Sequence, residues 1–425
     1  MPKFTSRQLA IVGGAALLVL IIFGVIYFVG LRPSANSSPA NLTMWGTESP
    51  DVMDILIRAY SKIHSNVRVE YTRVSESEYS VKLLNALASG HGPDLFFVRS
   101  HELPTSLIVP APETQFTLSQ VQTLFPKVVE QDFAPGGMVY ALPLYIDTLA
   151  LIYNKTIFDR SGVVSPPKTW GEFENLSANL RVLDDQGRVK KAGAAIGGSS
   201  RTIGDASDIL ELLMLQNGTK MIDDALRGAA FSSPQGQTSF DYYVRFADPA
   251  DENYTWDDSG PNSLDSFAAG NTVMLIDYAS HIKDLRNKNP YLDIGVAPVP
   301  QVDIENSVSF AEYGGLAVSK QSPQVAWAWD FVIQSSTNPD LVKAYLDASG
   351  RPPALRSAIG IKVNDPNLGV FARGALIARS WYYADHPKIQ NILSQAIQKV
   401  ITGGTDSKTA LRDAERAVTQ IITGR

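Results

Sequence analysis

Hydrophobic and polar residues follow strand and helix patterns in turn along the first part of the chain. Short apolar or alternating runs predict strands, and apolar positions at three- and four-residue spacing predict helices. The expected order is a strand at 42–45, a helix at 52–63, a strand at 67–74, a helix at 79–88 and a strand at 95–98. Ser49 and Pro50 suit the N-cap and the first position of the first helix. This order predicts an open sheet with helices on both faces.

The same alternation continues in the second part of the chain. We expect strands at 149–153, 194–196, 273–276 and 294–298, and helices at 169–183 and 205–215. Thr169 and Glu172 have the spacing of a capping box. Two apolar stripes at helical spacing, over 389–400 and 411–422, predict a pair of helices at the end of the chain.

The first residues follow a different pattern. Residues 9–31 carry no charge, and a helix of this length would extend about 34 Å at 1.5 Å per residue, enough to cross a bilayer. Lys3 and Arg7 precede it, which favours a cytoplasmic N-terminus at 1–8 and export of the rest. Residues 32–41 are rich in Pro, Ser and Asn and predict a flexible tether. The sequence therefore predicts a single-pass anchor in the cell membrane, with a cleaved signal peptide as the alternative.

Composition narrows the classes of function. The 425 residues are 44% hydrophobic and 19% charged, typical of a folded protein of two or three globular units. The net charge of -6 makes nucleic acid an unlikely partner. The absence of cysteine excludes disulfides, thiolate metal sites, a cysteine nucleophile and a lipid-modified N-terminal cysteine. The five histidines show no ligand spacing, so we expect no metal and no cofactor.

Several segments, taken in order, resemble the extracellular solute-binding proteins of ABC importers, specifically the carbohydrate-binding family that includes maltose-binding protein. The resemblance covers about 42–423. Its most specific segments are LTMWG, ALASGHGPDLFFV, VYALPLYIDTLALIYNKTIFDRSGV followed by PPKTWGEF, SFAAGNTVMLIDY, IGVAPVP, YGGLAVSKQSPQVAWAWDFVIQ and ILSQAIQKVITGGTDSKTALRDAERAV. Several cleft positions that are aromatic in maltose-binding protein are small or charged here, including 197–201.

The resemblance implies a type II periplasmic-binding-protein-like fold, in which two α/β lobes are joined by a hinge and hold a ligand between them. Crossing segments would lie at 144–148, 300–310 and 353–359. The implied lobes are 42–145 with 310–354, and 146–309 with 355–425. The resemblance also implies that the lobes close on a mono- or oligosaccharide, which permease subunits of the importer then accept.

Candidate ligand contacts follow the predicted strands, because ligands of open α/β sheets bind beyond the carboxyl ends of strands. Aromatic faces can stack on sugar rings, and charged or hydroxyl groups can hydrogen-bond sugar hydroxyls. The candidates are Trp45, Glu48, Arg99, His101, Glu102, Tyr145, Asp147, Ser199, Ser200, Arg201, Asp277, Tyr278, His281, Glu312, Tyr313, Gly314, Arg351 and Trp381. Glu312 to Gly315 are expected to precede a strand. Trp381 also fits core packing, which is the interpretation preferred for Trp170, Trp327 and Trp329.

A binding protein without catalytic residues is the leading interpretation. The sequence has no HExxH, GxSxG or Walker motif. Glu48 and Asp147 could cut a glycosidic bond only if they faced each other across the cleft at the right separation, so a glycan-acting enzyme is the weaker hypothesis. A binder of a peptide, a polyamine or another small solute, or a ligand sensor, stays open as the alternative.

Overall fold

The computed structural model describes residues 39–100, 102–225, 227–381 and 385–424, and these form two α/β lobes. The first sheet has the order β11-β10-β3-β1-β2, and β4 also pairs with β10. Its parallel pairs are β1 with β2, β1 with β3 and β10 with β11, whereas β10 runs antiparallel to β3 and β4. The strands are β1 (Ala40–Gly46), β2 (Val67–Arg73), β3 (Leu95–Arg99), β4 (Ala141–Thr148), β10 (Ser309–Val318) and β11 (Ala378–Arg379).

The second sheet has the order β6-β7-β8-β5-β9 and is mixed. β7 runs parallel to β8, whereas β5 is antiparallel to both β8 and β9, and β6 is antiparallel to β7. Its strands are β5 (Ala150–Asn154), β6 (Val182–Leu183), β7 (Val189–Ala195), β8 (Thr272–Asp277) and β9 (Ile294–Pro298).

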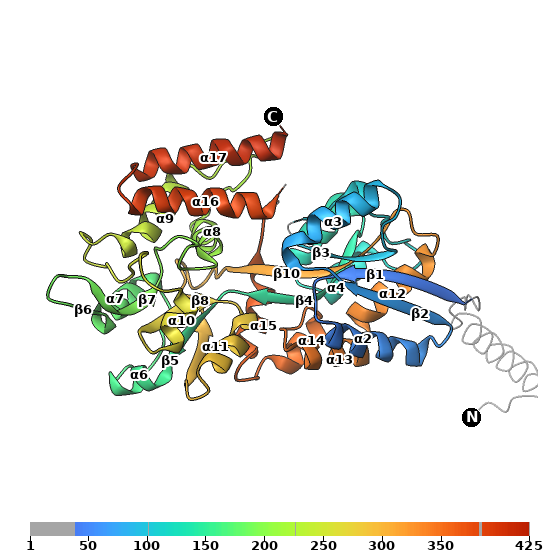
Figure 1. Ribbon diagram of the computed structural model, residues 1–425, viewed down its shortest axis with the longest axis horizontal. Helices are drawn as coiled ribbons and strands as arrows, with labels where there is room; N and C mark the ends of the chain where they lie inside the picture. Colours follow the sequence, from blue (N-terminus) through green and yellow to red (C-terminus); the bar gives the residue numbers. More distant parts are fainter. Residues whose placement is uncertain (1–38, 101, 226, 382–384, 425) are drawn as a thin grey trace, which may run out of the picture.

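Helices cover both sheets (Figure 1). Those that precede β4 and those between β10 and β11 are α2 (Pro50–Ile63), α3 (Glu76–Ala88), α4 (Leu118–Leu124), α5 (Lys127–Phe133), α12 (Val325–Thr337), α13 (Pro339–Ser349), α14 (Arg356–Lys362) and α15 (Gly369–Leu376). The others are α6 (Lys155–Arg160), α7 (Trp170–Leu180), α8 (Ala206–Gln216), α9 (Pro234–Val244), α10 (Ser263–Ala268), α11 (Ile282–Lys288), α16 (His386–Ile401) and α17 (Ser407–Thr423). One-turn 3₁₀ helices are η1 (Thr105–Leu107), η2 (Pro135–Gly137), η3 (Arg245–Ala247) and η4 (Ala279–His281).

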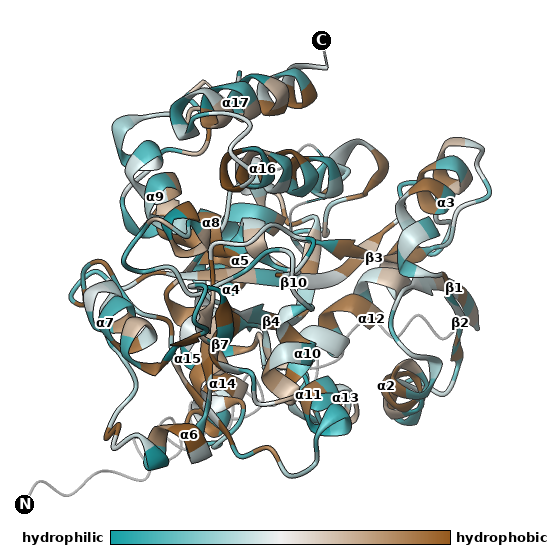
Figure 2. Cartoon of the chain, turned by 60° about the vertical axis from the view of Figure 1, so that its left-hand side comes forward, coloured by the Kyte–Doolittle hydropathy of each residue, from teal (hydrophilic) through white to brown (hydrophobic). Residues whose placement is uncertain are grey.

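The predicted terminal helix pair is confirmed as α16 and α17, which lie against each other on one lobe. Hydrophilic and hydrophobic residues alternate around α17 (Figure 2), and its buried positions are Ala410, Leu411, Ala414 and Val418. Their spacing is that of a single helical face. Because only this face is buried, apolar residues recur at helical spacing in the sequence, and this spacing was enough to predict the helix.

Two separate hydrophobic cores correspond to the two lobes. The first is built from residues between 40 and 146 and between 311 and 375, and Trp329 is its largest fully buried side chain. The second is built from residues between 149 and 310 and between 371 and 418. Trp170, Trp327 and Trp329 are all buried in these cores, as their interpretation as packing residues requires. The exact limits of the lobes stay a prediction.

β4 and β10 connect the lobes (Figure 1). β4 ends at Thr148, and β5 of the second sheet begins at Ala150. In β10 the change occurs between Phe310, which packs in the second core, and Ala311, which packs in the first. The expectation that Glu312 to Gly315 precede a strand is wrong, because all four lie inside β10 and pair with β4. The two crossing strands therefore form one antiparallel ribbon below the space between the lobes.

The N-terminal anchor predicted at 9–31 lies outside the described residues. Within the described ranges, no helix combines the length and the apolar composition needed to cross a membrane.

The capping box of α4 gives a local test of stability. Gln120 N–H donates to the Thr117 hydroxyl at 3.3 Å, and Thr117 N–H donates to the Gln120 side chain at 2.8 Å. Thr117→Ala is expected to lower the free energy of unfolding of its lobe by about 1 kcal/mol. Urea denaturation of the full chain measures this loss. Ser49→Ala is the matched control, since the Ser49 side chain makes no capping bond to α2, and an equal loss in both variants would contradict the prediction.

Candidate functional site

A cavity of about 390 Å³ lies between the lobes and above the β4–β10 ribbon. It takes its walls from both sheets and from the loops at their edges. The lining residues are Thr47, Glu76, Phe97, Arg99, Tyr145, Asp147, Tyr278, Ser280, His281, Asp284, Glu312 and Arg351. We call this cavity the cleft. Since its wall residues are mostly charged or hydroxyl-bearing, its chemistry suits a polar ligand rather than an apolar one.

An arginine between two glutamates forms the first-lobe wall of the cleft. Arg99 ends β3, and its guanidinium donates to the Glu312 carboxylate on β10 at 2.8 Å. It also forms an ion pair with Glu76, the first residue of α3. All three side chains keep partial exposure, with 31% for Arg99. The arginine is thus held in place and still accessible from the cleft.

A second arginine covers the aromatic side chain of β4. The Arg351 guanidinium lies 4.3 Å from the centre of the Tyr145 ring, a cation–π contact. Glu48 lies 3.9 Å from Arg351 and completes the charge pair. Phe97 lies nearly parallel to the Tyr145 ring, with 6.5 Å between the centroids. The guanidinium therefore occupies a position over the aromatic ring that a sugar could otherwise take.

Asp147 joins the ribbon to the second lobe. Its buried carboxylate accepts the backbone N–H groups of Thr148, Ala279 and Ser280, each at 3.0 Å. Burial raises the pKa of Asp147 to about 6, while the three amides and the charge of Arg351 act in the opposite direction. The carboxylate fixes the loop after β8 to the crossing strand.

The second-lobe wall contains Tyr278 and His281, which follow β8. The Tyr278 hydroxyl donates to Asp208 of α8 at 2.7 Å. His281 Nδ1 lies 2.5 Å from Asp277 Oδ1, and this hydrogen bond is the main reason that the pKa of His281 rises to about 9. His281 is therefore a cation at neutral pH.

Asp205, Asp277 and His281 bring their side-chain ligand atoms within 4.8 Å of one another, so among the described residues they form a group that could hold a metal ion. Burial raises the pKa of Asp205 well above its usual range, which favours a protonated carboxyl there. The hydrogen bond between His281 and Asp277 already satisfies the imidazole nitrogen.

The absence of a side chain at Gly314 makes room for one cleft residue. A Cβ atom at Gly314 would lie 1.9 Å from Cζ of Phe97. Phe97 could not keep its place in the cleft wall if β10 carried a larger residue there. Glycine thus permits the close approach of an aromatic ring to the backbone.

The structure brings seven of the predicted site residues together in the cleft wall: Arg99, Tyr145, Asp147, Tyr278, His281, Glu312 and Arg351. Three others contact this wall from behind. Glu48 faces Arg351, Asp277 binds His281, and Gly314 lies against Phe97. His101 lies outside the described residues. The role of each in ligand binding stays a prediction.

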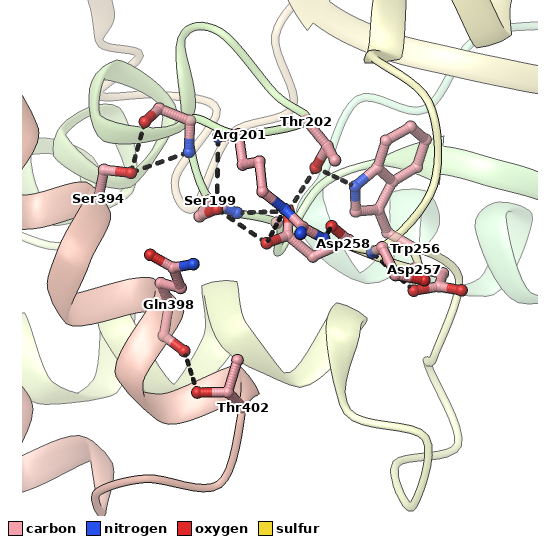
Figure 3. A network of polar contacts seen from close by, with 12 residues as sticks. Ser199, Arg201, Thr202, Trp256, Asp257, Asp258, Ser394, Gln398 and Thr402 are labelled. Carbon is pink, nitrogen blue, oxygen red and sulfur yellow. Dashed lines mark hydrogen bonds and ion pairs between the residues drawn. The ribbon is translucent and has the colours of Figure 1, made fainter.

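The predicted contacts Ser199 and Arg201 lie in another network of the second lobe (Figure 3), which Ser200 joins through Ser394. Ser199 donates from its N–H and its hydroxyl to the Asp258 carboxylate at 2.9 and 2.8 Å. The Arg201 guanidinium donates to the Asp258 carbonyl. Ser200 N–H donates to the Ser394 hydroxyl of α16 at 2.9 Å. These groups hold loops together and are not part of the cleft lining.

The remaining predicted residues also lie away from the cleft lining. The Trp381 indole N–H donates to the buried Glu211 at 2.7 Å, so Trp381 packs in the second core. The Tyr313 hydroxyl donates to Asp132 at 2.7 Å inside the first lobe. Trp45 packs against the first core. Glu102 accepts from the Ser80 hydroxyl at 3.4 Å, and burial raises its pKa.

Five lining residues were not predicted: Thr47, Glu76, Phe97, Ser280 and Asp284. Thr47, Ser280 and Asp284 lie close in sequence to predicted contacts that follow β1 and β8. The rule that ligands bind beyond the carboxyl ends of strands could therefore have found them. Glu76 comes three residues after β2 and obeys the same rule. Phe97 gave no signal, because an apolar residue inside a short apolar strand predicts a core position.

Comparison with known proteins gives consistent similarities. The model of the family described as bacterial extracellular solute-binding protein matches residues 46–333. A maltotriose-binding protein of Pyrococcus abyssi is 22% identical over 372 residues, which are 84% of this chain and 75% of the relative. A multiple sugar-binding protein of Streptococcus mutans is 23% identical over 235 residues, 53% of each chain.

Solved structures share the fold. The sugar-binding protein MalE of Xanthomonas citri superposes with a TM-score of 0.77 at 18% identity, covering 91% of this chain and 98% of the other. A cyclo/maltodextrin-binding protein complexed with maltotetraose gives a TM-score of 0.73 at 19% identity, with 92% and 98% covered. At this level of identity the likeness establishes the two-lobed architecture.

Proposed function

Because the chain belongs to the bacterial extracellular solute-binding proteins, we propose that it binds a mono- or oligosaccharide in the cleft and delivers it to an ABC importer. The family is one of binding proteins, and the proposal requires no catalytic step. The relatives named above carry sugar-binding descriptions, which support a carbohydrate as the solute.

The observation that carries the proposal is a polar cleft with walls from both lobes over a two-stranded ribbon. Hydroxyl, carboxylate and guanidinium groups there can donate to and accept from the hydroxyls of a sugar. The seven predicted residues in the wall are the proposed ligand contacts.

Closure of the lobes is the proposed consequence of binding. A ligand shifts a two-state equilibrium only when it binds one state better than the other. A sugar that contacts Arg99 and Glu312 of one lobe as well as Ser280 and His281 of the other makes both sets of contacts only when the walls are near each other. The closed form is the one proposed to dock on the permease.

The location of the protein follows from the same proposal. The binding lobes would lie outside the cytoplasmic membrane, held by the charge-free segment 9–31 through the tether 32–41. A tether keeps loaded protein at high local concentration near its importer. Membrane fractionation of cells tests the anchor, and a soluble product that begins near Ser37 would contradict it.

Arg351→Ala tests the site. Calorimetric titration of the full chain with neutral mono- and oligosaccharides is expected to give measurable binding, and the variant should bind the same sugar about tenfold more weakly. The reason is the loss of charged donors that lie at the cleft wall. Arg412→Ala, on the exposed face of α17, is the matched control. Failure of every saccharide to bind, or equal affinity in both variants, would contradict the proposed site.

A further inference from the structure

The cleft carries more negative than positive groups. Its lining has four carboxylates, Glu76, Asp147, Asp284 and Glu312, against two arginines and His281. Glu48 and Asp277 add two more carboxylates directly behind, in contact with Arg351 and His281. Even when His281 is counted as a cation, the six carboxylates outnumber the cationic side chains by three.

Each cation of the wall is already engaged by a carboxylate. Arg99 lies between Glu76 and Glu312, Arg351 faces Glu48, and His281 hydrogen-bonds Asp277. An anionic ligand would have to displace these carboxylates or accept their repulsion at short range. The arginines are therefore poor binding groups for a sugar acid or a sugar phosphate.

One carboxylate of the wall is held by no other side chain. Asp284 lies on α11, lines the cleft and is exposed. Within the described residues, no hydrogen bond or ion pair joins its carboxylate to another group; its neighbour Lys288 on the same helix pairs with Asp265 instead. Asp284 thus offers its carboxylate oxygens as acceptors at the second-lobe edge of the cleft, near the His281 ring, whose pKa it helps to raise.

Stacking surface is scarce in the same cavity. The Arg351 guanidinium covers Tyr145, the Tyr278 hydroxyl is bound to Asp208, and both tyrosines are buried. Phe97 is the aromatic side chain of the lining that is half-buried. Charge and hydrogen bonding must then supply more of the affinity than ring stacking does.

We infer that the cleft selects a small saccharide that carries a protonated amino group, with the ammonium placed at Asp284. This inference rests on the proposed function, since it specifies the kind of sugar bound at that site. A neutral sugar satisfies the hydroxyl contacts but leaves the charge excess uncompensated. An ammonium on the ring supplies both the charge and three hydrogen-bond donors.

Matched sugar pairs test the inference. The full chain is titrated at about pH 6.5, where an amino group on a carbon flanked by oxygen-bearing carbons is still protonated. Glucose, galactose and mannose are compared with their 2-amino counterparts, and cellobiose with the β-1,4-linked dimer of glucosamine. The amino member of the best-binding pair is expected to bind about tenfold tighter than its neutral partner. Its N-acetyl derivative should lose that advantage, and the corresponding uronic acid should bind more weakly than the neutral sugar.

The variant Asp284→Asn locates the ammonium. The ratio of amino-sugar to neutral-sugar affinity is expected to fall three- to tenfold, because the variant removes a full charge and keeps the size of the side chain. Asp159→Asn is the matched control, an exposed aspartate on α6 that is absent from the cleft lining. Its affinity ratio should equal that of the unchanged protein.

The outcomes separate this inference from the proposed function. If neutral sugars bind as tightly as their amino counterparts, or sugar acids bind best, the amine preference is wrong while saccharide binding stands. If a polyamine such as spermidine binds and no saccharide does, both the amine-sugar inference and the proposed saccharide-binding function are wrong. An unchanged affinity ratio in Asp284→Asn would refute the placement of the ammonium at that residue.

Discussion

Asp147→Ala is expected to lower the free energy of unfolding by about 3–5 kcal/mol, because each buried amide without a partner costs about 1–3 kcal/mol. The substitution removes the common acceptor of three backbone N–H groups, two of them from the loop that follows β8. Ala279 is itself buried, so water does not readily replace the carboxylate at its N–H. The same loop carries His281, and saccharide affinity should fall as well.

Chemical denaturation of the full chain measures this effect. Asp147→Asn keeps an acceptor oxygen and is expected to lose about half as much stability. Asp159→Ala, at an exposed position of the same lobe, should change stability by less than about 0.5 kcal/mol. The free energies of unfolding of Asp147→Ala and of the unchanged protein could instead differ by less than about 1 kcal/mol. The carboxylate would then not be what holds the loop after β8 to β4.

Sequence patterns predicted the cleft residues whose positions depend on the neighbouring strand alone. Arg99 ends an apolar strand, and Tyr278 and His281 directly follow another, so periodicity was enough to place them at sheet edges. The mixed direction of the second sheet was not predictable in this way. β5 pairs antiparallel with both β8 and β9, which join it from more than 100 residues away.

The rule that ligand contacts follow the ends of strands failed where polar groups instead hydrogen-bond residues that are distant in the sequence. Ser199 comes four residues after β7, as His281 comes four residues after β8. Asp258 and Ser394 nevertheless hold the loop of Ser199 and Ser200 in a separate network (Figure 3). No feature of the sequence near residue 199 predicts that Asp258 lies beside it in the folded chain. The same holds for Phe97, whose access to the cleft depends on a missing side chain at Gly314 in another strand.

Stability should decrease as the pH rises from about 6.5 to 9. Burial raises the pKa of Asp208 and of Asp132 to about 7, and the hydrogen bond to Asp277 raises that of His281 to about 9. In each case the folded chain keeps a proton that the unfolded chain has already released. The stability gained from these protons is complete below the unfolded pKa and is lost as the pH rises through the folded pKa.

His386 changes stability in the opposite direction, at lower pH. Burial lowers its pKa to about 4, so between about pH 4 and 6.5 the unfolded chain binds a proton that the folded chain does not. Stability from this residue therefore rises with pH up to about 6.5. Above that pH, His386 no longer changes the stability, and the decreasing contributions of the carboxyls with raised pKa and of His281 remain.

The expected decrease from pH 6.5 to 9 is about 1 kcal/mol for each of Asp208 and Asp132. His281 adds about 1–2 kcal/mol after allowance for solvent screening of its partly exposed ring. Differential scanning calorimetry of the full chain should show the melting temperature of the affected lobes falling by about 5–10 °C across this range. His281→Gln is expected to remove about half of the fall, whereas His91→Gln, at an exposed position, should keep it. A melting temperature that stays constant or rises between these pH values would mean that the carboxyls and the imidazole do not hold their protons in the folded chain.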